Sequence, residues 1–188
     1  MNDAQILDAR LHKLLVEIDQ ELAAQARVFG CLHCGGKLHR ALYPRKPRGW
    51  PDGEIHKETR LSYCCETCRR RTTPASVRFL GRRVYSAAVM VLSSVSSSRL
   101  SVASTRTLCH ALKIPKRTLE RWRRWWREGF LKTPLWIHGQ ALFMPTIEHK
   151  ELPGSLLERF QGNDWGERLT RCLQFLASET LPSRGQLG

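Results

Sequence analysis

Two cysteine pairs of the form C-x-x-C are the clearest chemical signal in the sequence. Cys31 and Cys34 form the first pair, in C-L-H-C-G-G, and Cys65 and Cys68 form the second, in C-E-T-C. Four thiolates can surround one zinc ion tetrahedrally at about 2.3 Å, and paired spacings of this kind suit that geometry. Four sulfur ligands leave zinc no open position for water. The pattern therefore predicts one structural zinc ion rather than a catalytic one.

Other potential ligands lie close to these pairs in the sequence. Cys64 directly precedes Cys65, so its side chain should point away from a metal that Cys65 binds. Three histidines occur in the same region, and we expect them on the surface: His33, His39 and His56. Replacement of one cysteine ligand by Cys64 or by a histidine stays open at this point. Cys109 and Cys172 lie on apolar helical faces and are expected to be small core residues.

Basic residues are concentrated in the middle of the chain. Lys and Arg number 31 against 17 Asp and Glu, for a formal net charge of +14. Residues 31–83 carry +9 and residues 84–132 carry +8, whereas residues 1–30 carry −2 and residues 133–188 carry −1. A basic block between two near-neutral segments favours binding to a polyanion. Charge alone does not separate specific nucleic-acid binding from nonspecific attraction to RNA or acidic lipid.

A run of arginines follows the second cysteine pair. A backbone fixed by a neighbouring metal would place arginines well for holding phosphate groups. The candidates for such contacts are Arg69, Arg70, Arg71, Arg78, Arg82 and Arg83. A solvated basic loop is the alternative.

A second pattern, of helix, tight turn and helix, lies further along the chain. Periodicity predicts helices over 103–112 and Lys116–Glu128, joined by Lys113-Ile-Pro115. Pro115 suits the start of the second of these helices, because the amide that proline lacks is not needed there. An apolar face of this helix should pack on the preceding helices; it consists of Leu119, Trp122 and Trp126.

The opposite face of the same helix is basic. At 100° per residue Arg117, Arg121 and Arg124 point away from the apolar side, as a recognition helix in the major groove requires. We expect Arg117 and Arg121 to read bases, since arginine can donate two hydrogen bonds to guanine. Lys116 and Thr118 would contact a base edge or a phosphate. The alternative is an ordinary amphipathic helix with a solvated basic face.

The expected fold is mainly α with a small zinc-ribbon β element. We expect an N-terminal amphipathic helix (1–30), a zinc ribbon with a basic arm (31–81), a three-helix helix-turn-helix domain (82–132) and a C-terminal helical segment with a frayed tail (133–188). Helices are predicted at 3–28, 83–92 and 163–178, strands at Lys37–Leu42 and Arg60–Cys64, a connection at Ser93–Arg99 and a frayed tail at Pro182–Gly188.

The N-terminal helix carries a short heptad pattern formed by Leu7, Leu11, Leu14 and Ile18. The pattern covers barely two heptads, so packing on the same chain is favoured over a coiled coil. A homodimer through this helix stays open.

The two patterns together resemble the N-terminal regions of bacterial transposases and related mobile-element proteins. The resemblance covers roughly residues 31–130 and rests on C-L-H-C-G-G, C-E-T-C-R-R-R and A-L-K-I-P-K-R-T-L-E-R-W-R-R-W-W. It implies recognition of element ends or of an operator, with a transposase or recombinase as partner protein. The ribonuclease-H-like catalytic domain of such families has no counterpart here, which puts strand transfer in doubt.

We therefore expect a sequence-specific binder of double-stranded DNA that is not an enzyme. A transcriptional regulator, an unrecognised nuclease or recombinase subunit, and an RNA-associated zinc ribbon are the alternatives. The sequence has neither the layout of a signal peptide nor an apolar run of membrane-spanning length. The expected location is therefore the bacterial cytoplasm, in association with the nucleoid and with no membrane partner.

Overall fold

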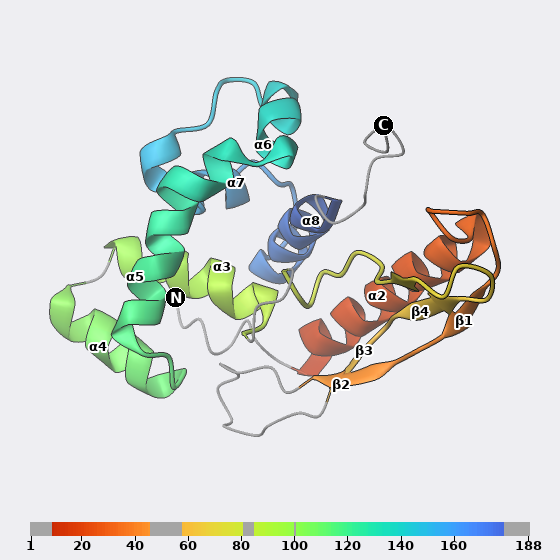
Figure 1. The fold of residues 1–188 in the computed structure, drawn as a ribbon. Helices are drawn as coiled ribbons and strands as arrows, with labels where there is room; N and C mark the ends of the chain where they lie inside the picture. The colour runs from red at the N-terminus through yellow and green to blue at the C-terminus, as the bar shows by residue number, and fades with distance from the viewer. Residues whose placement is uncertain (1–8, 46–57, 81–84, 100, 179–188) are drawn as a thin grey trace.

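A computed structural model describes residues 9–45, 58–80, 85–99 and 101–178 (Figure 1). Several expectations concern residues outside these ranges: Leu7, His56, Arg82, Arg83, and the tail Pro182–Gly188. Throughout the described ranges, no helix has both the length and the apolar character needed to cross a lipid bilayer.

Helix α2 (Ala9–Phe29) lies along the strands in Figure 1 and contributes to the main core. Leu11, Leu15 and Ile18 recur at helical spacing and are buried in that core. Gly30 ends the helix at φ 78°, a left-handed conformation that glycine adopts without steric cost. Because Leu11 and Ile18 face the same chain, they are not available as the seam of a coiled coil.

Two small antiparallel sheets follow α2. In the first, β1 (Leu38–Arg40) pairs with β4 (Tyr63–Cys65), which also pairs with β5 (Arg71–Thr72). In the second, β2 (Tyr43–Arg45) pairs with β3 (Glu58–Arg60). Strand β1 lies inside the predicted Lys37–Leu42, and the predicted Arg60–Cys64 is divided between β3 and β4.

Residues Pro74–Leu80, which we call the strap, connect the sheets to the helical part of the molecule. Every residue of the strap is buried, although it forms no regular helix or strand. Arg78 is paired there with two carboxylates, at 2.8 Å from Asp19 of α2 and 2.7 Å from Glu58 of β3. Asp19 also accepts hydrogen bonds from the Ser76 hydroxyl (2.6 Å) and the Val77 amide (2.7 Å).

The prediction that Arg78 contacts DNA is therefore wrong. Its guanidinium lies in the interior and is neutralised by Asp19 and Glu58, so it is not free to bind a phosphate. A buried arginine needs such partners because an unpaired charge in the interior is costly. The carboxylates lie far from Arg78 in sequence, and only the fold brings the three groups together.

Helix α3 (Ala87–Arg99) extends through the segment Ser93–Arg99 that we expected to be a connection, and that prediction is wrong. Ser93 and Ser94 are buried, and their hydroxyls donate hydrogen bonds to the carbonyl oxygens of Val89 (2.5 Å) and Met90 (2.7 Å). Serine is acceptable inside this helix because a carbonyl oxygen of the preceding turn accepts a hydrogen bond from each hydroxyl.

Helices α4 (Val102–Ala111) and α5 (Lys116–Arg124) form the pair that the sequence indicated. The predicted helix Lys116–Glu128 keeps its regular α form only to Arg124. It continues as a π-helical turn, η1 (Trp125–Gly129), and a 3-10 turn, η2 (Phe130–Lys132). Trp125 packs directly over Gly129, where an added Cβ would lie 2.6 Å from the indole ring.

The C-terminal segment covers the core through short elements and one long helix. These elements are α6 (Pro134–Gly139), η3 (Gln140–Leu142), η4 (His149–Glu151), α7 (Gly154–Leu157) and α8 (Trp165–Ala177).

Aromatic rings link the end of the α5 segment to this C-terminal part. Ring centroids are 5.0 Å apart for Trp126 and Phe130 and 5.2 Å apart for Phe130 and Trp136. Those of Phe143 and Phe175 are 5.3 Å apart. These contacts make the C-terminal segment part of the core that supports α5.

The buried ion pairs lead to a stability prediction. Arg78→Met should lower the free energy of unfolding by about 3–5 kcal/mol, because it leaves Asp19 buried without its arginine and leaves Glu58 with His12 at 3.0 Å in place of an ion pair with Arg78. Denaturant titration measures the change. Lys13→Met is the control, since it breaks only an exposed pair with Glu17 at 4.0 Å and should cost less than about 0.5 kcal/mol. Equal stability of the two variants would contradict a structural role for Arg78.

Candidate metal centre and nucleic-acid interface

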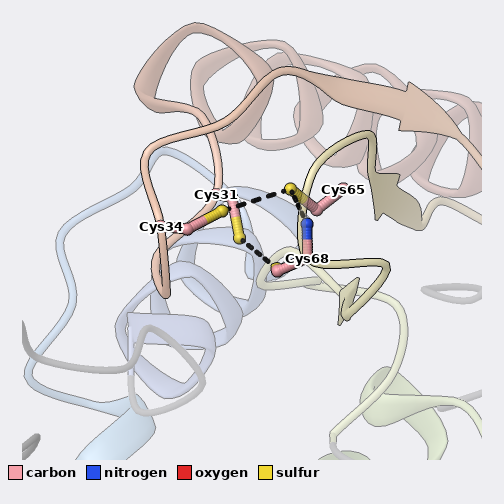
Figure 2. Close-up of side chains that lie close together, drawn as sticks. All are labelled: Cys31, Cys34, Cys65 and Cys68. Carbon is pink, nitrogen blue, oxygen red and sulfur yellow. Dashed lines mark hydrogen bonds between the residues drawn. The ribbon is translucent and has the colours of Figure 1, made fainter.

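Cys31, Cys34, Cys65 and Cys68 converge at one end of the sheet, with all four sulfurs within 4.8 Å of one another (Figure 2). The Cys31 and Cys68 sulfurs are 3.5 Å apart, and those of Cys34 and Cys65 are 3.4 Å apart. Both separations are far longer than the ~2.05 Å of a disulfide bond. Sulfurs around a tetrahedral zinc ion at 2.3 Å lie about 3.8 Å from one another. The four cysteines could therefore hold one metal ion.

The two cysteine pairs lie in turns of the same backbone design. In the first, the Gly35 amide donates to the Cys31 carbonyl (2.8 Å), and the Cys31 amide donates to the Gly36 carbonyl (2.9 Å). In the second, the Arg69 amide donates to the Cys65 carbonyl (3.2 Å), and the Cys65 amide donates to the Arg70 carbonyl (2.9 Å). Such turns hold both sulfurs of a pair on one side of the backbone.

Corresponding positions of the two turns take the left-handed conformation, which L side chains rarely adopt. Gly35 has φ 72°, and Arg69 has φ 60°. Glycine adopts this geometry freely, whereas a residue with a Cβ is strained there by about 1 kcal/mol or more. Arg69 therefore has a structural constraint that the sequence reading of it as a phosphate contact did not include.

Gly36 is required by the close approach of the two turns. A Cβ at this position would lie 2.7 Å from the Thr67 hydroxyl oxygen and 3.1 Å from the Cys65 sulfur. The Glu66 amide also donates to the Lys37 carbonyl at 2.9 Å and joins the turns directly. The second glycine of C-L-H-C-G-G thus lets the two cysteine pairs face each other.

The local backbone favours thiolates at part of the cluster. The backbone amide of Cys68 lowers the pKa of Cys65 to about 6, and the amide of His33 lowers the pKa of Cys31. At Cys68 the amide of Arg70 acts in the same direction, but burial and the neighbouring thiols outweigh it and raise the pKa to about 12. Four adjacent sulfurs cannot all be anionic unless a cation lies among them, which is what a bound metal ion would supply.

The alternative ligands that the structure describes, Cys64, His33 and His39, lie outside the cluster. The Cys64 sulfur is turned away from the cluster, 3.4 Å from the Arg69 carbonyl. The His33 Nδ1 atom lies 3.1 Å from Nη1 of Arg70, and the His39 Nε2 atom lies 2.7 Å from Oε2 of Glu66. Cys172 is buried in the main core, where burial raises its pKa, and Cys109 packs against that core.

The arginines beside the second turn are exposed but differ in their contacts. Arg70 links the two turns through His33. Arg71 donates to the Ala41 carbonyl at 3.0 Å and lies over the Tyr43 ring at 5.6 Å, so contacts within the protein hold its position. Arg69, Arg70 and Arg71 remain candidates for phosphate contacts, whereas Arg78 does not.

The turn between α4 and α5 is closed by backbone hydrogen bonds of the Schellman type. The Ile114 amide donates to the Cys109 carbonyl (2.8 Å), and the Lys113 amide donates to the His110 carbonyl (3.1 Å). Lys113 has φ 50°, at the position where glycine is usual. Ile114 is buried beneath the turn, which anchors the start of α5.

Helix α5 has one buried face and one basic face. Leu119, Trp122 and Trp126 are buried in the main core, and the Trp122 ring meets the Tyr85 ring edge-on at 4.9 Å. The opposite face is exposed to solvent and carries Lys116, Arg117, Arg121 and Arg124. It also carries Glu120, which pairs with Lys116 at 3.7 Å. This distribution agrees with the helical pattern in the sequence.

Thr118 does not belong to the exposed face. Its side chain is buried and its amide donates to the Pro115 carbonyl at 2.8 Å, so the prediction that it contacts DNA is wrong. It lies on the first turn of α5, next to the anchoring residue Leu119.

Sequence reasoning did not give the structural roles of three residues that shape the site: Gly36, Thr67 and Arg69. Their signal was present in the alignment of the two hexapeptides that begin at Cys31 and Cys65, which places Arg69 opposite Gly35. Asp19 and Glu58 were also missed, and no local pattern identifies them as partners of Arg78.

The chain matches no protein-family model, no curated protein and no solved structure. Its function must therefore be inferred from the geometry of these two sites.

The cluster leads to a prediction about metal binding. Cys34→Ser or Cys68→Ser should release the metal ion and unfold the two turns, because binding energy contributes directly to folding here. Cys64→Ser, Cys109→Ser and Cys172→Ser are the matched controls and should keep one ion per chain. Elemental analysis of the purified variants measures the number of metal ions per chain. Full occupancy in Cys65→Ser would show that another residue is the ligand.

Proposed function

We propose that the protein binds double-stranded DNA in a sequence-specific manner, with α5 in the major groove and one zinc ion as a structural element of the four-cysteine centre. The observation that carries the proposal is the exposed basic face of α5, which is anchored on its other side by α3 and α4.

The basic face of α5 has the arrangement that a recognition helix needs. Arg117, Arg121 and Arg124 follow one another at steps of four and three residues, so they lie on one side of α5. The buried tryptophans on the other side hold the helix in a fixed orientation. A fixed helix orientation is what directional hydrogen bonds to base edges require.

Zinc is the metal that this donor set favours. Four thiolates are soft ligands, and their tetrahedral arrangement with no place for water is typical of structural zinc. The hydrophobic cluster around the centre is small: Ala23, Cys31, Leu38, Tyr63 and Cys65. A metal ion would stabilise this part of the chain where little apolar surface is buried.

The metal centre would also place basic residues for phosphate contacts. Arg69 and Arg70 are exposed on a turn whose backbone the centre holds. Figure 1 shows the sheets and the α4–α5 pair at opposite ends of the molecule in that view, so the two basic regions would contact separate stretches of DNA. The resemblance to transposase N-terminal regions suggests element ends as the class of target.

The proposal predicts different effects for the two basic regions. Arg121→Ala should weaken binding to the preferred site by about 1–3 kcal/mol and binding to random DNA much less, because a bidentate contact to a base is lost. Arg70→Ala should weaken both equally and lower the slope of log affinity against log salt by about one unit.

The measurements are affinities for a selected site and for random duplex DNA over a salt series. Random-site selection with the zinc-loaded protein supplies the preferred site. Arg171→Ala is the control, since this exposed arginine lies on α8 and should leave both affinities unchanged. If Arg121→Ala weakens both DNAs equally, α5 does not read the sequence.

We also predict that the isolated protein neither cuts nor joins DNA in magnesium or manganese. Over the described part of the chain, the cysteine cluster is the only group of three or more potential metal ligands, and nuclease metals prefer carboxylates. Incubation of the selected site with the protein tests this. Cleavage that disappears on mutation of a particular Asp or Glu would contradict it.

A further inference from the structure

A groove of about 770 Å³ lies between the C-terminal half of α2 and the strand β1 side of the sheets. The residues Ala23, Ala24, Val28, Leu42 and Leu61 give it an apolar lining. Val28 is 87% exposed and Leu42 is 46% exposed, which is unusual for large apolar side chains. The groove therefore offers apolar surface that the described chain does not cover.

The groove is also basic. Arg27, Lys37 and Arg40 line it, and none of the described residues in its lining is acidic. Tyr63 offers little of its ring, because the side chain is buried and its hydroxyl donates to the Ala23 carbonyl at 2.8 Å. Nucleic-acid bases bind on exposed aromatic rings, which this groove lacks. Its chemistry fits an apolar protein surface flanked by carboxylates.

The chain itself carries such a surface in the segment after α6. Phe143 is extended, with φ −110° and ψ 104°, and its ring packs inward against Phe160 (5.9 Å) and Phe175 (5.3 Å). Neighbours of an extended residue point to the opposite side. Leu142 and Met144 accordingly point outward together and are 76% and 80% exposed.

Carboxylates follow these two apolar side chains in the sequence. Glu148, Glu151 and Glu158 line a shallow hollow that begins at Thr146, two residues after Met144. They outnumber the cations of the same segment, Lys150 and Arg159. An apolar projection on a segment with net negative charge is complementary to an apolar groove with a basic lining.

We propose that the groove binds the Leu142–Met144 projection of a second copy of this chain. The contact joins two different surfaces, so a pair of copies keeps one free groove and one free projection, and association continues head to tail. The overall charge of +14 opposes close approach of copies, so the association is weak and depends on protein concentration. Neutralisation by DNA would favour it.

Sedimentation velocity of the full metal-loaded chain without DNA tests the proposal independently of DNA binding. The sedimentation coefficient of the wild-type protein should rise with concentration. Leu42→Glu blocks the groove and Met144→Lys blocks the projection, so each variant alone should stay monomeric. An equimolar mixture of the two should form dimers and nothing larger, because only one groove and one projection remain intact.

Leu14→Glu is the matched control, since Leu14 is an exposed leucine of α2 outside both surfaces, and it should associate like wild type. Metal content and melting temperature check folding, and Arg40→Glu or Leu142→Lys replaces any variant that does not fold. A wild-type protein that is monomeric at every concentration would overturn the proposal. So would variants that associate like wild type, or a mixture that forms no dimer.

Discussion

The buried contact of Arg78 with Asp19 and Glu58 is the interaction on which the arrangement of the molecule depends. It joins helix α2, strand β3 and the strap at one point, within 2.8 Å for both ion pairs. A charged group buried in this way tolerates little displacement, because any loss of a partner leaves an unpaired charge in the interior. The contact therefore sets how the sheets sit relative to the helix that enters the main core. It also explains why one arginine of a basic run is absent from the surface.

The two ends of the molecule are stabilised by different means. The helical end has a large core, in which Trp122, Trp126 and Phe130 are buried and hold α5. The sheet end has few buried apolar side chains, and a metal ion in the cysteine cluster would supply stability that packing does not. Both ends thus present basic side chains on a backbone that is fixed on its inner side. Aromatic packing fixes the helical end, and hydrogen bonds within and between the two cysteine turns fix the sheet end.

The exposed face of α5 and the groove beside α2 differ in their chemistry. The exposed arginines of α5 suit a polyanion, as the concentration of positive charge in residues 31–132 indicates. The groove beside α2 combines cations with apolar side chains, which is the chemistry of a protein contact. One basic chain can therefore offer one surface to nucleic acid and another to a second copy of itself.

Features set by short-range patterns could be read from the sequence alone. The C-x-x-C spacings identified the four sulfurs that converge, and the helical period of α5 placed its arginines opposite its tryptophans. The sequence could not show that Arg78 and Thr118 are buried, or that Ser93 and Ser94 belong to a helix. Those outcomes depend on partners distant in the chain or on backbone hydrogen bonds, such as Asp19 for Arg78 and the Val89 carbonyl for Ser93. Only the tertiary structure brings Asp19 to Arg78 and buries Thr118, Ser93 and Ser94, because burial and pairing of a side chain are decided by what packs around it.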